Sequence, residues 1–454
     1  MNKVVKRLSA LTVAVVMIVA LFAGCAQKGG NASGSGQQAD TKSQGNITLK
    51  FTTWVNNKDL NGNYLDELIT KEFTKQNPNL KVEFQLLTEN NSNEYMQKTD
   101  LMIAGGEDID VVSYSNRNEY ADRVARGMLA PLDEYIAAEG KKYSDMYTLD
   151  TAVNGKIYAF PWDLKPGFVM MNKKYLDEAG LPVPKPDWTW DDYREYAKKL
   201  TKGDGKDKRY GGYFHTFSNY KIFPITNAYD FWPILKKDGT SNLLDPNIKW
   251  ALQFMHDLEA VDKSHLPYFE AKSGKLSYRD LFFQGKVAMI PIGAWMIPEV
   301  SSTLDKYPHD WVTAFATVPK FKDYPAGATT GDGNFCAIPK SSKHKAEAYK
   351  LVKFNCDEGV YIRATGLPAK KDYNMDQLLK TMLNGKENLY DVASLKAVLG
   401  GVKLNSATNI FPYNKKVSDA VESEFEKYLV GGATLDSTIE NADKITKEII
   451  SAGK

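Results

Sequence analysis

The repeated alternation of strand-like and helix-like segments is the feature that most restricts the fold of this chain. Three strand patterns, each followed by a helix pattern, succeed one another from Ile47: 47–54 with 64–76, 80–87 with 94–104, and 109–114 with a helix that ends near Arg126. Successive strand–helix units of this kind predict a parallel sheet with helices on its faces. The sequence therefore predicts an α/β fold.

The carboxyl ends of parallel strands are where such sheets bind ligands. The three predicted strands end at Trp54, at the loop Thr88–Ser92 and at Tyr114 to Arg117. We therefore expect these residues to face a binding cleft.

Helix signals continue through the second half of the chain. Thr189 and Asp192 form a capping-box pattern that opens one helix, and Asp245-Pro246 opens another. Helices near 344–354, 414–429 and 434–450 complete the prediction.

The N-terminus has the composition of an export signal. Lys3, Lys6 and Arg7 precede an uncharged run over 8–26, whose apolar core is shorter than the roughly 20 residues of a membrane-spanning helix. Residues 1–24 are therefore predicted to be a signal peptide. The segment 25–46, rich in Gly, Ser and Gln, is predicted to be a flexible tether.

The exit of this signal, Leu21-Phe22-Ala23-Gly24-Cys25, resembles a bacterial lipobox, in which the cysteine becomes the first mature residue and carries the lipid. Phe22 departs from the aliphatic residue usual at that position. The alternative is an unlipidated signal peptide with a chance cysteine. The resemblance implies lipidation of Cys25 and a location outside the cytoplasm, on the outer face of the bacterial cell membrane.

Charge and motif spacing exclude several classes of function. The net charge is +2, or −1 after removal of the signal peptide, which is too small for a nucleic-acid binder. The turn Asn57–Gly62 imitates the start of a calcium loop, but Leu68 stands where a carboxylate is needed, so we expect no metal and no cofactor. Cys336 and Cys356 could form a disulfide or remain two buried thiols.

The chain resembles the family 1 extracellular solute-binding proteins, the sugar-binding type that serves bacterial ABC importers and includes maltodextrin-binding proteins. The resemblance runs through most of the mature chain, over residues 72–84, 101–112, 128–136, 155–181, 186–201, 282–295 and 337–354. It implies two α/β lobes joined by hinge crossovers, which close on a ligand like a Venus flytrap.

Mapped onto this sequence, the resemblance places crossovers near Asp163–Gly167, Ile290–Gly293 and Pro339–Lys343. The N-terminal lobe would then comprise 47–163 plus 293–340, and the C-terminal lobe 164–292 plus 341–454.

A sugar offers an apolar face and a rim of hydroxyls, so its site needs flat aromatic side chains and fixed polar groups. Aromatic residues make up 12% of the chain. At strand ends and implied hinges we expect the ligand-binding residues Trp54, Asn116, Arg117, Trp162, Asp163, Asp230, Trp232, Trp295, Asp332 and Asn334. Core packing is the alternative for the tryptophans, and a tight turn is the alternative for Asp332 and Asn334. We expect Trp188, Trp190, Trp250 and Trp311 to be structural.

The predicted function is therefore capture of an oligosaccharide and its delivery to the permease subunits of an ABC transporter. The protein is expected to be a monomer and not an enzyme, with the membrane reached through lipidated Cys25. Other classes are a secreted glycoside hydrolase, which would need two carboxyl groups about 5–10 Å apart, and a surface-structure protein without a small-molecule ligand.

Overall fold

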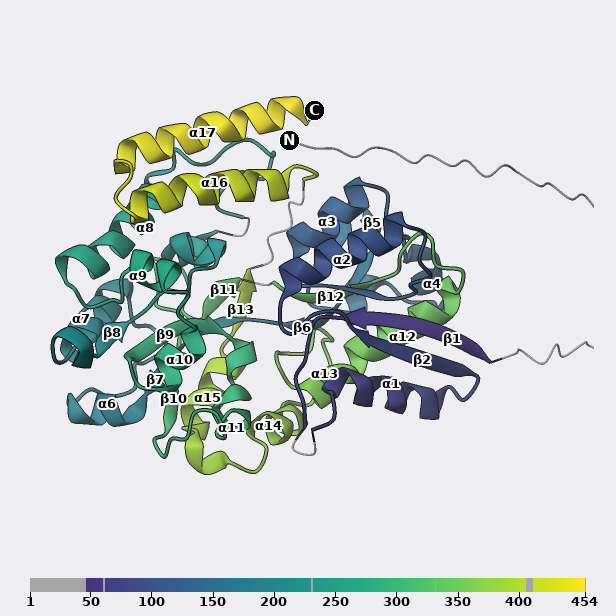
Figure 1. Cartoon of the computed structure of the whole chain (residues 1–454), viewed down its shortest axis with the longest axis horizontal. Helices are drawn as coiled ribbons and strands as arrows, with labels where there is room; N and C mark the ends of the chain where they lie inside the picture. Colours follow the sequence, from purple (N-terminus) through teal and green to yellow (C-terminus); the bar gives the residue numbers. More distant parts are fainter. Residues whose placement is uncertain (1–45, 60–61, 230–231, 331, 406–410, 454) are drawn as a thin grey trace, which may run out of the picture. The chain divides into compact units, whose positions relative to one another are not determined.

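The predicted strand–helix units are present in the computed structural model, which describes residues 46–59, 62–229, 232–330, 332–405 and 411–453. In order, they are β1 (Ile47–Thr53), α1 (Leu65–Gln76), β2 (Leu80–Leu86), α2 (Ser92–Ala104), β3 (Val112–Tyr114) and α3 (Arg117–Ala125). Figure 1 shows them in purple and blue. The helices start where the sequence supplies caps; for example, the side chain of Asn116 accepts a hydrogen bond from the Glu119 N–H at the start of α3.

The first sheet region is mixed rather than purely parallel. β1 pairs in parallel with β2, and Phe51 forms a parallel bridge with Val111 just before β3. A distant strand, β12 (Gly333–Ala337), then lies antiparallel between β3 and β6 (Ala159–Leu164). The prediction of a parallel sheet is therefore correct for β1, β2 and the bridge at Val111. It did not include β12, whose insertion depends on a pairing over more than 200 residues.

The second sheet has the strand order β10-β7-β9-β8. It contains β7 (Gly167–Asn172), β8 (Tyr210–Gly212), β9 (Val287–Gly293) and β10 (Thr313–Thr317). Helix α7 (Trp190–Leu200), which packs against this sheet, begins with the predicted capping box, in which Thr189 and Asp192 exchange side-chain and backbone hydrogen bonds.

Within the described residues the chain passes between the first sheet region and the side of the second sheet at three places. It crosses between β6 and β7, where a hinge was predicted, and again between β11 (Ala328–Thr330) and β12. The third crossing lies between α13 (Gly359–Arg363), which packs on α1, and α15 (Val392–Gly400), which packs on β10.

The other two predicted hinges do not coincide with these crossings. Residues 290–293 lie inside β9, and 339–343 join β12 to α12 (Lys345–Asp357), which packs on β6 and β12. As a result, β10 belongs to the second sheet and α12 covers the first, unlike the predicted lobe boundaries. Local sequence patterns predicted where helices and strands lie. They did not predict which sheet each one joins, because that depends on pairing between residues far apart in the sequence.

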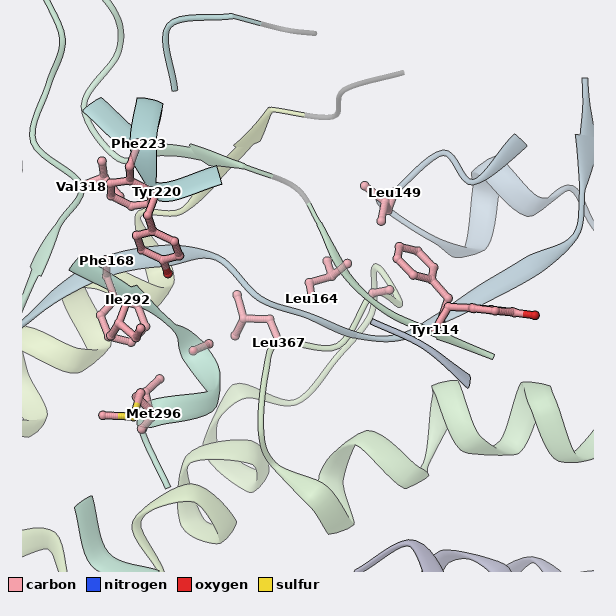
Figure 2. Close-up of a cluster of buried hydrophobic side chains, with 14 of the residues drawn as sticks. Tyr114, Leu149, Leu164, Phe168, Tyr220, Phe223, Ile292, Met296, Val318 and Leu367 are labelled. Atoms are coloured by element: carbon pink, nitrogen blue, oxygen red, sulfur yellow. The ribbon is translucent and has the colours of Figure 1, made fainter. Parts of the chain in front are cut away.

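The crossing segments are joined to each other by backbone hydrogen bonds. The Leu164 N–H donates to the Leu367 carbonyl at 2.7 Å, and the Leu367 N–H donates back at 2.8 Å. Figure 2 shows these two leucines between buried side chains of the first sheet region, such as Tyr114, and of the second, such as Phe168. The apolar core is therefore continuous along the crossover.

Two long helices end the chain, α16 (Asn414–Leu429) and α17 (Leu435–Ala452), yellow in Figure 1. They pack against each other, and α16 also contacts α3, where the Asn414 Nδ2 donates to the Asn118 Oδ1 at 3.2 Å. In the described part of the chain, no helix combines the length and apolar character needed to cross a membrane.

The two cysteines that the sequence left undecided are free, buried thiols. Cys336 lies on β12, where its sulfur accepts a hydrogen bond from the Asn355 Nδ2 at 3.4 Å. Burial raises the pKa of the Cys336 thiol to about 12. The thiol is therefore protonated at neutral pH and packs as a small apolar group.

The raised pKa of the Glu259 carboxyl leads us to predict that the stability of the protein depends on pH. It lies in the π-helical turn η3 (Asp257–Val261), accepts a hydrogen bond from the Tyr268 N–H at 2.9 Å, and has a pKa that burial raises from 4.5 to about 8. Since the folded state holds this proton more tightly than the unfolded chain, the contribution of Glu259 to stability is fully present below pH 4.5 and is lost as the pH rises through about 8.

Replacing Glu259 with glutamine should remove this loss, because the amide cannot ionise and keeps an acceptor for the Tyr268 N–H. Thermal unfolding followed by circular dichroism should show a higher Tm than wild type at pH 8 and a similar Tm at pH 4.5. Glu270→Gln, at an exposed position on α9 (Tyr268–Ser273), is the matched control. A difference in Tm between Glu259→Gln and wild type that is equal at both pH values would contradict this role of Glu259.

Candidate functional site

A cavity of about 970 Å³ lies at the loops that follow the strands of both sheet regions. Trp54 after β1, Asn90 after β2 and Asn116 after β3 line it, at the strand ends where the sequence predicts a ligand cleft. That these residues bind a ligand stays a prediction. Gly167 and Gly293 bring the second sheet to the same cavity. The cavity is thus built where the chain crosses between the sheets.

Most of the predicted ligand-binding residues line this cavity. They are Trp54, Asn116, Arg117, Trp162, Trp232, Trp295, Asp332 and Asn334. Asp230 lies outside the described residues. The tryptophans predicted to be structural, Trp188, Trp190, Trp250 and Trp311, do not line the cavity, and Trp188 instead donates its Nε1–H to the Thr317 carbonyl at 2.8 Å.

Asp163 is the predicted residue that the structure places behind the cavity wall. It is fully buried, and its Oδ1 accepts the Asn334 N–H at 3.0 Å while its Oδ2 accepts the Thr365 hydroxyl at 3.0 Å. Both of these donors line the cavity. Asp163 therefore positions wall residues rather than facing a ligand.

Trp54 and Trp162 form an aromatic part of the wall on the first sheet region. Their rings lie 6.5 Å apart, and Trp54 also packs on Tyr95 at 5.2 Å. Only 7% of Trp54 and 1% of Trp162 are exposed, so most of their ring area packs against the protein. Beneath Trp162, the guanidinium of Arg363 lies 3.9 Å from the ring centroid.

Trp295 offers more of its ring to the cavity. It lies on η4 (Ala294–Met296), directly after β9, and is partly exposed. Its Nε1–H donates to the Tyr278 hydroxyl at 3.2 Å, and the Lys165 ammonium lies 5.6 Å from its ring centroid. A Cβ at Gly293 would come within 1.9 Å of the Trp295 ring, so only glycine allows this ring position.

The polar part of the site is centred on Asp332. Its Oδ1 accepts the Gly333 N–H at 2.8 Å and the Arg117 N–H at 3.3 Å, at the start of α3. Burial raises the pKa of Asp332, and the nearby charge of Arg117 opposes that rise. In the described part of the chain, the buried Oδ1 of Asn334 has no hydrogen-bond partner, so it is an available acceptor at the cavity wall.

A second charged pair, Arg279 with Glu299, holds the wall on the second sheet. The Arg279 Nε and a terminal nitrogen both donate to the Glu299 carboxylate at 2.6 Å, and the guanidinium lies 4.5 Å from the Tyr278 ring centroid. Burial by itself lowers the pKa of Arg279, but the charge and hydrogen bonds of Glu299 outweigh it, so the pKa is raised overall. The planar two-point contact also fixes both side chains.

Lys165, at the first crossing, carries the ammonium beside Trp295. It makes no hydrogen bond or ion pair through that ammonium within the described residues, and burial lowers its pKa although Asp163 and Asp332 oppose the change. Its donors are therefore available to a molecule in the cavity.

The described residues include no group of three or more His, Cys, Asp or Glu side chains placed to hold a metal ion. At the calcium-like turn, both carboxylate oxygens of Asp59 accept hydrogen bonds from Asn63, at 2.8 and 3.0 Å.

The sequence family described as bacterial extracellular solute-binding protein matches residues 58–354, more than half of the chain. The chain belongs to this family. The family resemblance noted from the sequence segments is therefore confirmed.

Among relatives of this solute-binding protein, an uncharacterized lipoprotein of Streptomyces antibioticus is 25% identical over 62% of this chain and 59% of its own length. The diacetylchitobiose binding protein DasA of Streptomyces coelicolor is 24% identical over 79% of this chain and 82% of its own. An ABC substrate-binding protein of Listeria monocytogenes, solved in complex with cycloalternan, has a TM-score of 0.72 at 24% identity and covers 89% of this chain and 98% of its own. This likeness confirms the two-lobed α/β fold, and the matched family consists of binding proteins.

Sequence reasoning missed several residues that line the site of this solute-binding protein: Lys165, Phe217, Tyr278, Arg279, Glu299 and Lys415. Lys165 lies inside the predicted hinge 163–167 and could have been found there. Phe217 and Tyr278 had no distinguishing signal among the 45 Tyr and Phe residues of the chain. Lys415 reaches the cavity only because α16 packs beside α3.

Proposed function

We propose that this protein captures an oligosaccharide in the cavity and delivers it to the permease subunits of an ABC transporter. The observation that carries the proposal is the combination of an aromatic wall with fixed polar groups in one cavity. Trp295 supplies partly exposed ring surface and Trp54 and Trp162 form a packed aromatic part of the wall, while Asn334 and Lys165 present polar atoms that make no hydrogen bond within the described residues. A sugar needs both kinds of contact.

The size of the cavity supports a ligand of more than one sugar unit. Its volume of about 970 Å³ is near the upper end of the roughly 300–1,000 Å³ that is usual for small-molecule sites. The relative named for diacetylchitobiose and the structure solved with cycloalternan agree with such a ligand.

The proposed lobes follow the sheets. One lobe would contain β1, β2, β3, β6 and β12 with their helices, and the other β7 to β10 with α7, α8 (Pro246–His256) and α15. Ligand capture would close the lobes about the three crossings, the motion typical of binding proteins with hinged lobes.

The direct test is isothermal titration calorimetry with diacetylchitobiose, maltotriose and mannotriose, with chromatography of the sugars after prolonged incubation. Saturable binding of at least one sugar without new products is the expected result. Absence of binding to all three would contradict sugar capture as proposed. Release of shorter sugars would instead favour the hydrolase alternative.

The protein would be held at the outer face of the cell membrane by a lipid on Cys25. The lipobox-like sequence before Cys25 and the lipoprotein relative support this location. Both Cys25 and the predicted tether up to residue 45 lie outside the described residues.

Replacing Cys25 with serine should move the protein from the membrane fraction to the soluble extracytoplasmic fraction, because no lipid could be attached. Cell fractionation and immunoblotting measure the distribution. Cys356→Ser, at a buried thiol far from the signal, should stay with the membrane as wild type does. Persistence of Cys25→Ser in the membrane fraction would argue against a lipid anchor.

A further inference from the structure

Phe217 is a half-exposed aromatic residue on the cavity wall. It follows β8 in the segment His215-Thr216-Phe217, and 51% of the residue is exposed. Single exposed apolar residues are common on protein surfaces and need no explanation. Phe269 on α9 is such a case, since it is 61% exposed and does not line the cavity. Phe217 differs from Phe269 in two ways: it lines the cavity, and its ring packs on another buried ring.

The support is the ring of His215, which is only 5% exposed. The two ring centroids lie 3.7 Å apart with an angle of 30° between the planes, and the Phe217 N–H donates to the His215 Nδ1 at 2.9 Å. His215 in turn packs on Tyr278 at 4.5 Å and on Tyr220 at 5.5 Å. One face of Phe217 is therefore covered and fixed, which lowers the entropy cost of placing a ligand on the other face.

The charge state of His215 suits an apolar support. Burial, together with the smaller effects of the positive charges of Arg279 and Lys221, lowers its pKa to about 3. The uncharged ring can accept the Phe217 N–H at Nδ1. The groups packed around it, Tyr220 and Tyr278, are also uncharged at neutral pH because burial raises their pKa values.

The aromatic side chains that support Phe217 also contact Trp295, through Tyr278. Tyr278 packs on His215 through its ring and accepts the Trp295 Nε1–H at its hydroxyl, so Phe217, His215, Tyr278 and Trp295 form one contiguous wall. Both ends of this wall, Phe217 and Trp295, line the cavity and are partly exposed. Two separate ring surfaces are thus held in a fixed relation to each other.

We propose that Phe217 is a second stacking platform, which binds a different sugar ring of the same oligosaccharide from the one that stacks on Trp295. The inference rests on the proposed sugar-binding function and adds a statement about length. A ligand with a single ring would use one platform, whereas a longer chain would use both.

Calorimetric titration of wild type and variants with the monosaccharides and the oligosaccharides of two, three and four units of the chito, malto and manno series tests this inference. Phe217→Ala should weaken binding of the longer members by roughly 2- to 13-fold, the effect of one lost aromatic contact. Phe217→Leu, which keeps apolar volume without a flat ring, should weaken it similarly. Phe217→Tyr should bind like wild type, and so should Phe269→Ala, the matched exposed phenylalanine.

If wild type binds longer sugars more tightly and Phe217→Ala and Phe217→Leu lose this gain in affinity, the result would support two platforms. Affinity of Phe217→Leu within twofold of wild type for every length would overturn the inference while leaving sugar capture intact. The same fold-loss at every length would overturn the claim of a second ring. If wild type binds no sugar of the three series, the proposed function fails, and this inference fails with it.

Discussion

Replacing Trp295 with alanine should weaken sugar binding by about 5- to 150-fold, because a central aromatic anchor typically contributes about 1–3 kcal/mol. The Trp295 ring is partly exposed in the cavity, and its hydrogen bond to the Tyr278 hydroxyl holds it in place. Gly293 has no side chain and therefore leaves room for the ring in this position. The substitution would remove ring area that is already ordered before the ligand arrives. Calorimetry with the sugar that wild type binds most tightly measures the change.

Two further variants sharpen this result. Trp295→Phe keeps a flat ring but loses the hydrogen bond to Tyr278, so its affinity should fall between wild type and alanine. Trp250→Ala removes a partly exposed tryptophan that packs on Phe254 and Phe321 outside the cavity, so it should lower stability without changing affinity. Unchanged affinity in Trp295→Ala would remove this residue from the site.

The second large effect concerns stability. Arg363 and Asp66 form an ion pair in which the two residues are only 2% and 1% exposed, and it connects α13 to α1. Arg363 also donates to the Asn355 Oδ1 at 2.5 Å and supports the Trp162 ring. Replacing Arg363 with methionine would leave the Asp66 charge buried without its partner, which costs about 3–5 kcal/mol.

Urea unfolding followed by tryptophan fluorescence measures this loss. Adding Asp66→Asn to Arg363→Met should restore part of the stability, because the buried charge is then absent. Lys75→Met breaks an exposed pair with Glu72 on α1 and should change stability little. A free energy of unfolding for Arg363→Met within about 1 kcal/mol of wild type would show that the buried pair is not a main determinant of stability.

The extent to which the sequence predicted this structure depends on the range of the interactions. Thr189 with Asp192 and Asn116 with Glu119 act within one helical turn, so the helices they cap could be placed from the sequence. The partners of β10 and β12 could not be placed in this way. Both strands are fully buried, and a buried strand carries no local sign of the sheet it joins.

The candidate site shows the same division. Trp54 and Asn116 follow strands, and Trp295 lies where the family resemblance implies an aromatic residue; all three line the cavity. Asp163 was predicted for its place beside Trp162, but its hydrogen bonds to Asn334 and Thr365 arise from β12 and from the third crossing. Its burial could be known only from the tertiary structure.

The paired backbone of Leu164 and Leu367 also determines how the protein can move. Two segments that share hydrogen bonds at 2.7 and 2.8 Å cannot twist independently without breaking them. They form a short two-stranded ribbon. Any rotation of one sheet region against the other would therefore have to carry these two crossing segments together at this point, rather than move each of them separately.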